Sequence, residues 1–320
     1  MQYKNILLLS AGRRVSLARA LDQVARANGA RCITADKVPE LSAACQDSGL
    51  LVTLPHVLSS DYPEALLSIC RRHDIKLVVP TIDTELPVLA ALRDEFARDG
   101  INIAVCSSAL VDVARDKRKT AAHFADYGIT SPRVFSNDSP QYPAIAKPYD
   151  GSLSRDIYIL RSEKDYRIAI DKVPNLMIAA YLEPQLHEEF TCDAYYNRDC
   201  RLECVVPRLR IEVRGGEVAK GRTVRNNIVE LFESKLQHIE GARGCLTFQF
   251  FRNTENGDLF MIELNARFGG GFPLTLAAGA NYPLWLYEEW VLDQPPSASR
   301  DWKDGLTMLR FDDAIFFDGH

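Results

Sequence analysis

The sequence predicts a mixed architecture, in which an N-terminal α/β domain with a parallel sheet precedes an α+β part. Strand-like and helix-like segments alternate over residues 1–110, which is typical of a parallel sheet covered by helices on both faces. After residue 184 the pattern is rich in strands up to Arg267 and then turns helical. With 320 residues, of which 47% are hydrophobic and 25% charged, the chain can bury a substantial core and form two or three compact units.

The first part of the chain predicts a repeated strand–helix unit. Short apolar runs predict strands and amphipathic runs predict helices, the first of which is stopped by Gly29. The expected strands are residues 5–10, 32–36, 76–80 and 101–106, and the expected helices are residues 14–28, 62–73 and 86–98.

The carboxyl ends of these strands form the expected functional edge, because ligands bind beyond them in open α/β sheets. Residues 10–14 and 81–85 would stand there, and their charged members Arg13, Asp83 and Glu85 are candidates to contact a substrate. Asp83 and Glu85 share a face if this segment is extended, so they could hold an ammonium group. They could equally cap the following helix, where acidic residues are favoured.

A nicotinamide-dinucleotide site is the rival interpretation of this domain, with Asp36 as the acid that binds the ribose. The first turn offers one glycine, Gly12, where the pyrophosphate fingerprint needs three. Arg13 and Arg14 also stand where the backbone would have to approach the phosphates. The sequence therefore disfavours the dinucleotide interpretation.

The middle of the chain predicts a long helix followed by a small α+β unit. The helix is expected over residues 111–128 and carries Asp116 and Lys117. The unit that follows is expected to contain strands at 144–148, 157–160 and 177–182 and a helix at 163–170. These patterns divide the chain into an N-terminal α/β domain (residues 1–110), a central unit with a glycine loop (111–184) and a C-terminal subdomain (185–320).

The composition argues against nucleic-acid and membrane partners. The net charge is -5, and Lys and Arg are spread along the chain, so no basic surface for nucleic acid is indicated. The longest apolar stretches are too short to cross a bilayer, and the chain begins with a strand rather than a signal peptide, so a cytoplasmic location is expected. The eight cysteines are scattered and are expected to be buried, reduced thiols.

Two apolar runs near the C-terminus predict a hairpin that carries metal ligands. Glu263 and Asn265 lie two residues apart, so in a strand they share a face. Gln249 would stand opposite Glu263 if a three-residue loop surrounds Asn256, whereas a two-residue loop would turn it to the other face. A carboxylate with amide oxygens indicates a Mg²⁺ site that substrate phosphates complete. Arg267, on the same face, suits a phosphoryl oxygen.

Three arginines form an alternating row in another strand-like run. For Arg208 and Arg210, bidentate binding of a substrate carboxylate or phosphate is the functional interpretation. A solvated edge strand is the alternative, and it is preferred for Arg214, which precedes Gly215 and Gly216.

Lys147 ends a predicted strand and precedes a loop of Gly and Ser residues. The backbone amides and hydroxyls of such a loop can bind phosphate. The order Gly-Lys-Ser of a Walker loop is missing, so this is a phosphate clamp of another kind.

Taken in order along the chain, these stretches resemble the ATP-grasp superfamily, in particular single-module proteins similar to the large subunit of carbamoyl-phosphate synthase. The resemblance covers nearly the whole chain and implies an ATP-grasp fold behind a Rossmann-like, pre-ATP-grasp domain. Its most specific stretches are residues 116–117, 146–156, 189–193, 206–217, 248–251 and 261–271.

The resemblance also implies roles for individual residues. It assigns the nucleotide phosphates to Lys117 and Lys147, the loop that covers them to Gly151, Ser152, Leu153 and Ser154, and the ribose to Glu189. It assigns the metal to Gln249, Glu263 and Asn265, and places Arg267 with Lys147 beside the transferred phosphoryl group. For Lys117, a solvated helix face is the alternative.

The adenine hinge departs from the family pattern. The chain reads Ala-Ala-Tyr-Leu-Glu-Pro over residues 179–184, where a Gln-Glu pair is usual. Backbone groups of Tyr181 and Leu182 could still bind the adenine edge, in a register that the sequence leaves open.

By this resemblance the protein is expected to be an ADP-forming ligase, which activates a small carboxylate as an acyl phosphate and joins it to an amine. ATP and Mg²⁺ are the expected cofactors, with Mn²⁺ as an alternative metal. Small carboxylate and amine molecules are the expected partners, and a homodimer is compatible with the sequence. Two alternatives stay open: bicarbonate activation of the carbamoyl-phosphate type, and an inactive nucleotide-binding sensor, which the altered hinge suggests.

Overall fold

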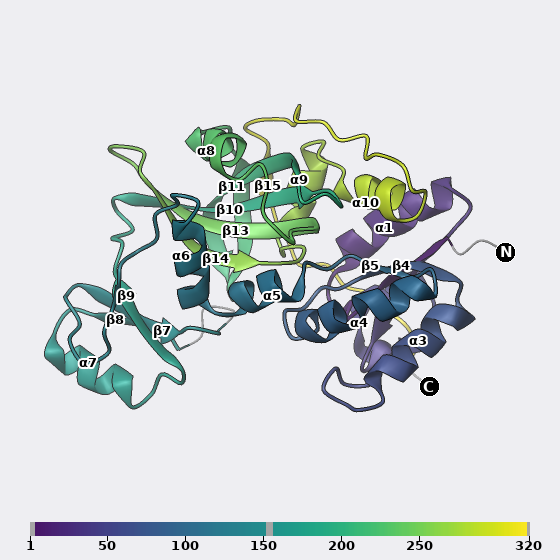
Figure 1. Ribbon diagram of the computed structural model, residues 1–320, viewed down its shortest axis with the longest axis horizontal. Coiled ribbons are helices and arrows are strands. Elements are labelled where there is room, and N and C mark those ends of the chain that lie inside the picture. Colours follow the sequence, from purple (N-terminus) through teal and green to yellow (C-terminus); the bar gives the residue numbers. More distant parts are fainter. Residues whose placement is uncertain (1–3, 152–155, 319–320) are drawn as a thin grey trace.

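The computed structural model describes residues 4–151 and 156–318, and this part of the chain contains three β-sheets (Figure 1). The first sheet is parallel, in the order β3-β2-β1-β4-β5. Its strands are β1 (Asn5–Leu8), β2 (Cys32–Asp36), β3 (Val52–Thr53), β4 (Ile75–Val79) and β5 (Asn102–Ile103). Its helices are α1 (Val15–Ala27), α3 (Tyr62–Arg72) and α4 (Leu86–Arg98), with the short η1 (Pro39–Leu41) and α2 (Ala43–Ser48).

The predicted α/β class is therefore confirmed for this domain. Strands β1 and β4 are buried along nearly their whole length, as a sheet covered on both faces requires. The short elements β3, η1 and α2 are not predicted by the sequence patterns, because they span less than two helical turns or only two strand residues.

A break at Asp116 replaces the single long helix expected over residues 111–128. The chain forms α5 (Ser108–Arg115) and α6 (Lys117–Ala125), with Asp116 extended between them. The Asp116 carboxylate accepts a hydrogen bond from the Arg118 amide and caps α6, a role that aspartate fills better than a helix interior. The break makes Lys117 the first residue of α6, where its amide donates to the Tyr149 carbonyl at 2.9 Å.

The second sheet forms a small lid unit at the left of Figure 1. Its antiparallel strands follow the order β6-β9-β7-β8. They are β6 (Val134–Phe135), β7 (Ala144–Pro148), β8 (Tyr158–Leu160) and β9 (Leu176–Ala180), and α7 (Glu163–Ile170) covers them. The lid unit has its own small apolar cluster, separate from the main core.

The third sheet is antiparallel, in the order β14-β13-β10-β11-β12-β15. Its strands are β10 (His187–Tyr196), β11 (Leu202–Arg214), β12 (Glu217–Thr223), β13 (Gly244–Asn253), β14 (Leu259–Asn265) and β15 (Thr307–Leu309). The accompanying helices are α8 (Asn227–Lys235), α9 (Phe272–Ala277) and α10 (Tyr282–Trp290). We call this the large sheet.

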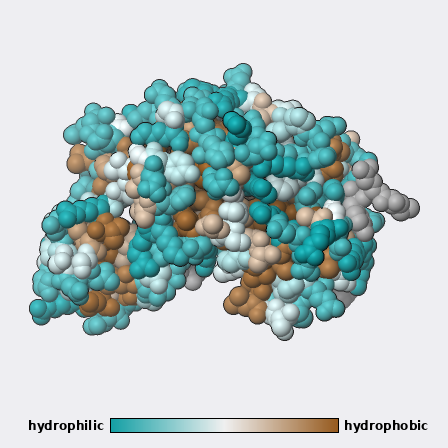
Figure 2. Space-filling model, in the orientation of Figure 1, coloured by the Kyte–Doolittle hydropathy of each residue, from teal (hydrophilic) through white to brown (hydrophobic). Residues whose placement is uncertain are grey.

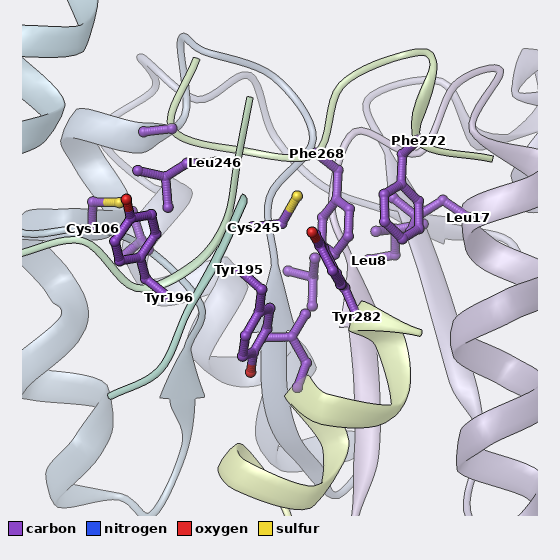
Figure 3. Packing of buried hydrophobic residues seen from close by; sticks show 14 of the residues in the cluster. Leu8, Leu17, Cys106, Tyr195, Tyr196, Cys245, Leu246, Phe268, Phe272 and Tyr282 are labelled. Atoms are coloured by element: carbon purple, nitrogen blue, oxygen red, sulfur yellow. The ribbon is translucent and has the colours of Figure 1, made fainter. Parts of the chain in front are cut away.

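The N-terminal domain and the large sheet share one continuous core. Figure 3 shows Leu8 of β1 and Leu17 of α1 in the same cluster as Phe268, Phe272 and Tyr282 from the C-terminal part. The rings of Phe268 and Phe272 meet edge to face with centroids 4.7 Å apart. Because this core is continuous, the carboxyl edge of the parallel sheet is held in a fixed position against the large sheet.

A buried carboxylate ties together the elements under the large sheet. Asp193 on β10 has no exposed surface and accepts hydrogen bonds from Arg208 on β11 at 2.8 Å, Thr247 on β13 at 3.0 Å and Thr275 on α9 at 2.6 Å. The Tyr282 hydroxyl also donates to the Asp193 carbonyl at 2.8 Å. One carboxylate thus connects two neighbouring strands and a helix.

All eight cysteines are buried and none forms a disulfide, as predicted for reduced thiols. Across residues 4–151 and 156–318, no helix combines the length and the apolar character that a membrane span requires.

Replacement of Asp193 is expected to weaken the fold strongly. The change Asp193→Ala leaves the Arg208 guanidinium buried without its counter-charge, which costs about 3–5 kcal/mol of unfolding free energy. Urea unfolding followed by circular dichroism measures this loss. The control is Glu212→Ala, which removes a surface carboxylate paired with Arg214 and Lys220 and is expected to change the midpoint little. Equal midpoints for the two variants would contradict the prediction.

Candidate active site

A cavity of about 490 Å³ opens where the N-terminal domain, the lid unit and the large sheet meet. Figure 2 shows the outline of the molecule indented between the lid unit and the N-terminal domain. Within the described residues, the charged side chains that line the cavity are Arg14, Arg115, Lys117, Lys147, Arg208, Arg210, Arg267, Asp83, Glu189, Glu217 and Glu263. Basic groups exceed acidic groups, so the cavity suits an anionic ligand.

The hairpin β13–β14 brings the three predicted metal ligands to the cavity. Gln249 lies opposite Glu263 in the strand register, as predicted, and Asn265 follows on the same strand. The loop is longer than the three residues expected, since Arg252 pairs with Leu259 and the Asn253 amide donates to the Asp258 carbonyl.

A β-bulge restores the register despite the longer loop. The pairing shifts by one residue between Gln249 and Phe250, and the extra residue is Ile262. The loop itself is held by the Asn253 side chain, which accepts from the amides of Glu255 and Asn256 at 2.9 and 3.1 Å. The predicted pairing is therefore right, while the predicted loop length is wrong.

Arg267 connects the metal-ligand strand to the N-terminal domain. Its Nη2 donates to Asp83 Oδ2 at 2.7 Å and to Asn265 Oδ1 at 3.1 Å. Asp83 stands after β4, at the carboxyl edge where the sequence places it, and it lines the cavity. The side chain of Asp83 does not cap α4, so the capping interpretation does not hold for it.

Both predicted phosphate-binding lysines line the cavity. Lys117 Nζ donates to the Gly151 carbonyl at 2.6 Å and lies 3.7 Å from Glu263 Oε2. With 9% of its surface exposed, Lys117 is not on a solvated helix face. Burial, and then the neighbouring Lys117, lower the pKa of Lys147 to about 8, although Glu263 and Glu189 oppose this.

Glu189 pairs with Arg210 on the neighbouring strand. Arg210 Nη1 lies 3.0 Å from Glu189 Oε1, and its Nη2 donates to the Gly216 carbonyl at 3.2 Å. Burial raises the pKa of Glu189, while Arg210 lowers it. Both side chains line the cavity. Ser152, Leu153 and Ser154 of the glycine loop lie outside the described residues.

A second, smaller pocket of about 110 Å³ adjoins the cavity beside the lid unit. Its walls are mostly apolar, and Tyr181 and Leu182 of the altered hinge contribute to them, together with Met177 and Phe251. Within the described residues, five side chains line both spaces: Lys117, Ile145, Lys147, Phe251 and Ile262. The Tyr181 amide already donates to the Pro143 carbonyl at 3.3 Å.

Two predicted substrate contacts lie elsewhere. Arg13 is exposed and does not line the cavity, because the turn at Gly12 directs its successor Arg14 inward instead. Glu85 is buried beneath the edge, where it accepts a hydrogen bond from Ser10 at 2.5 Å. Burial raises the pKa of Glu85 to about 7, and its side chain does not cap α4 either.

The arginine row separates into three environments. Arg208 is buried and its Nη2 is bound to Asp193, so it supports the cavity floor. Arg210 lines the cavity with Glu189, and Arg214 is exposed, as preferred from the sequence. The carboxylate of Asp36 accepts from the Gly12 amide at 2.9 Å, so it stabilises the turn rather than standing free for a ribose.

Arg14 and Glu217 also line the cavity, although no sequence pattern predicts a role for them. Burial, and then the neighbouring Arg267, lower the pKa of Arg14, while Glu217 and Asp83 raise it. Glu217 pairs with Arg310 at 2.8 Å, a partner 93 residues away. The glycine at position 12 is a local sequence signal that could have indicated the inward direction of Arg14. No local pattern could have indicated that Glu217 pairs with Arg310.

The donor set fits Mg²⁺ bound together with phosphates. The described residues contain no group of three or more His, Cys, Asp or Glu side chains that could hold a metal by themselves. One carboxylate with neighbouring amide oxygens fits a cation that keeps part of its shell for water and phosphate. Gln249, Glu263 and Asn265 provide these oxygens on the cavity wall, close to Lys117.

Comparison with known families gives two matches along the chain. Residues 6–104 match the family described as PylC-like, N-terminal domain. Residues 172–314 match the family described as ATP-grasp in the biosynthetic pathway with Ter operon. A search of curated proteins found no match.

Solved structures with the same fold cover nearly the whole chain. The biotin carboxylase domain of Hydrogenobacter thermophilus 2-oxoglutarate carboxylase, in complex with MgADP, ADP and bicarbonate, has a TM-score of 0.73 and 14% identity over 96% of this chain and 74% of its own. N5-carboxyaminoimidazole ribonucleotide synthetase from Thermus thermophilus has a TM-score of 0.69 and 18% identity over 92% and 80%. L-amino acid ligase from Bacillus licheniformis has a TM-score of 0.67 and 14% identity over 91% and 75%.

The parallel N-terminal sheet, the lid unit and the large antiparallel sheet agree with these matches. At such low identities, the solved structures establish the fold and leave the reaction to be argued from the site. The chain is an ATP-grasp protein with a PylC-like N-terminal domain.

Proposed function

We propose that the protein is an ADP-forming ligase that activates the carboxylate of a small molecule with ATP and joins it to an amine. One observation carries this proposal: Lys117, Lys147 and Arg267 converge on the cavity that also holds the oxygens of Glu263 and Asn265. The cationic side chains would neutralise the charge of the nucleotide phosphates, and the substrate carboxylate would lie beside the γ-phosphate. Charge neutralisation and alignment are the main requirements of phosphoryl transfer.

The nucleotide is proposed to lie between the lid unit and the large sheet. The apolar pocket would take the adenine, and the Tyr181 carbonyl with the Leu182 amide would bind its edge, since the Tyr181 amide is engaged. Glu189 would bind the ribose hydroxyls. Lys117, Lys147 and the loop formed by Gly151, Ser152, Leu153 and Ser154 would bind the phosphates.

Glu263 and Asn265, with Gln249 opposite, would hold Mg²⁺, or Mn²⁺ as a substitute. The ion would neutralise charge on the nucleotide phosphates when bound. Arg267 would contact the transferred phosphoryl group, and Asp83 and Asn265 hold its guanidinium in place. Its position is therefore set before any ligand binds.

The chemistry would proceed in two displacements. A carboxylate oxygen attacks the γ-phosphorus and the bond to the ADP oxygen breaks, which gives an acyl phosphate and ADP. The amine then attacks the carbonyl carbon, phosphate leaves, and the nitrogen loses a proton. The cavity residues would align the reactants and offset negative charge, and closure over the site would exclude water from the acyl phosphate. The reaction needs no nucleophile from the protein.

A second candidate is activation of bicarbonate. The observation that favours it is the fold shared with a biotin carboxylase domain dimer crystallised with bicarbonate. ATP turnover that is indifferent to added bicarbonate would count against this candidate. The same relative is a dimer, and a homodimer is accordingly proposed for this chain as well.

The principal test measures ADP release with MgATP across pooled carboxylic acids and amines. We expect turnover in one acid–amine pool and its loss by at least about 100-fold in Glu263→Gln, because this change removes the only carboxylate of the proposed metal set. The matched control is Glu188→Gln on β10, whose carboxylate lies 3.6 Å from Arg252 and outside the cavity.

The outcomes separate the candidate functions. Turnover that survives in Glu263→Gln would refute the proposed metal role. Tight nucleotide binding by the wild type without turnover in any pool would favour the sensor. Turnover that requires bicarbonate rather than another acid would favour the second candidate.

Lys147 gives a pH-dependent prediction. Its pKa of about 8 means that the lysine is charged and binds phosphate fully below this value, and loses its charge as the pH rises through it. We expect the Kd for MgADP to rise between about pH 7 and about pH 9 in the wild type. The variant Lys147→Arg keeps its charge over this range, so its Kd should stay nearly constant. An equally steep rise in both proteins, measured by calorimetry, would assign the effect to another group.

A further inference from the structure

On one wall of the cavity, some arginines form ion pairs and another does not. Arg267 is paired with Asp83 at 2.7 Å, and Arg310 is paired with Glu217 at 2.8 Å and also donates to the Gly270 carbonyl. Arg14 stands beside these groups but forms no ion pair and no side-chain hydrogen bond within the described residues. Arg208, Arg210 and Arg267 each have an acidic partner even where single N–H groups stay unpaired, whereas the whole guanidinium of Arg14 has no partner within the described residues.

The position of Arg14 is fixed by the backbone around it. Arg14 immediately precedes α1, after the left-handed turn at Gly12 (φ 45°), and its side chain is half-buried. A Cβ at residue 270 would lie 3.3 Å from Arg14 Nη1 and 2.9 Å from Glu217 Oε1. Gly270 thus leaves room for a basic and an acidic side chain that approach the same point.

The charges around Arg14 are distinct from those around the phosphate-binding lysines. The groups that act on Arg14 are Arg267, Glu217, Asp83 and Arg310. The groups that act on Lys147 are Lys117, Glu263 and Glu189. The strongest contributions to the two groups differ, and Arg267, whose Nη2 binds both Asp83 and Asn265, connects the surroundings of Arg14 with the proposed metal ligands. The cavity therefore has two subsites on either side of Arg267.

The chemistry of the subsite around Arg14 narrows its ligand. A half-buried guanidinium with open donors favours a carboxylate, which it can bind in a bidentate manner. Asp83 is paired with Arg267 through Oδ2, and Glu217 with Arg310 through Oε2. Within the described residues the second oxygen of each carboxylate keeps its acceptor capacity, which suits an ammonium group close to the ligand's carboxylate. A ligand that carries a carboxylate and an ammonium group on one carbon matches this arrangement of a guanidinium next to carboxylate oxygens.

Resting on the proposed ligase activity, we propose that Arg14 binds the carboxylate of an α-amino acid, which is the amine substrate, with Glu217 and Asp83 beside its amino group. The carboxylate at Arg14 is not the one that is phosphorylated, because that one must lie beyond Arg267 next to the phosphates. The amino group of the bound amino acid would then point toward Arg267, near which the acyl phosphate would form.

Calorimetry in the presence of MgADP tests this assignment without turnover. The probes are the twenty standard L-amino acids and, for the tightest binder, its decarboxylated amine and its deaminated acid. We expect at least one amino acid to bind, and both analogues to bind more weakly. In Arg14→Ala the affinity for the amino acid should fall by about 10- to 100-fold, as expected for loss of charged hydrogen bonds. The affinity of Arg14→Lys for the amino acid should lie between that of the wild type and that of Arg14→Ala.

The chain offers a matched control in the neighbouring residue. Arg13→Ala removes an exposed arginine that does not line the cavity, and it should leave amino-acid binding unchanged. Affinity for MgADP should be equal in the wild type, Arg13→Ala and Arg14→Ala, which shows that the variants are folded.

Three results would overturn the inference: no amino acid binds, the decarboxylated amine binds as tightly as the amino acid, or Arg14→Ala binds as the wild type does. If these occur while MgADP binds and ATP is turned over with an acid–amine pool, the ligase proposal stands and only the role of Arg14 falls. Absence of both nucleotide binding and turnover in the wild type would instead refute the ligase proposal itself.

Discussion

The ion pair between Asp193 and Arg208 is the interaction on which the rest of the site depends. Asp193 is fully buried, and its carboxylate accepts from Arg208 on β11 and from side chains on β13 and α9. One of these donors, the Thr247 hydroxyl, also lies 3.1 Å from the Arg267 carbonyl. The chain passes so close over the ion pair that a Cβ at Gly271 would lie 1.9 Å from Arg208 Nη1. An uncompensated charge at this depth would be costly, so the pair fixes the path of the segment that carries Arg267.

The cavity above this floor holds positive charge in excess before any ligand is present. Two features keep the cations in place: Arg267 is bound to Asp83 and Asn265, and Lys117 is bound to the Gly151 carbonyl. The lowered pKa of Lys147 reflects burial and the nearby Lys117, which is a cost that an anionic ligand would relieve. Electrostatic groups fixed in advance need little reorganisation when charge develops during a reaction.

The architecture divides the site into a rigid part and a separable part. The N-terminal domain and the large sheet share one core, so the edge that carries Asp83 cannot shift far from the strand that carries Glu263. The lid unit (Figure 1) has a separate apolar cluster, and its strand β7 carries Lys147. A unit with its own core can move against the remainder with little loss of packing, which suits binding and release of a nucleotide.

Local patterns in the sequence indicate which residues share a face of a strand, while several strands end earlier than these patterns predict. Gln249, Glu263 and Asn265 meet on the cavity wall because alternation along a strand is a local property of the backbone, and even an unexpected loop length was compensated by a bulge. How deeply a side chain is buried, and which side chain it binds, depend on the tertiary fold. Whether Arg13 or Arg14 faces the cavity depends on the turn at Gly12. Glu85 is buried with a hydrogen bond from Ser10, and Arg208 is buried with a hydrogen bond to Asp193. These contacts join elements that are distant in sequence and meet only in the folded chain. A local sequence pattern therefore cannot predict them.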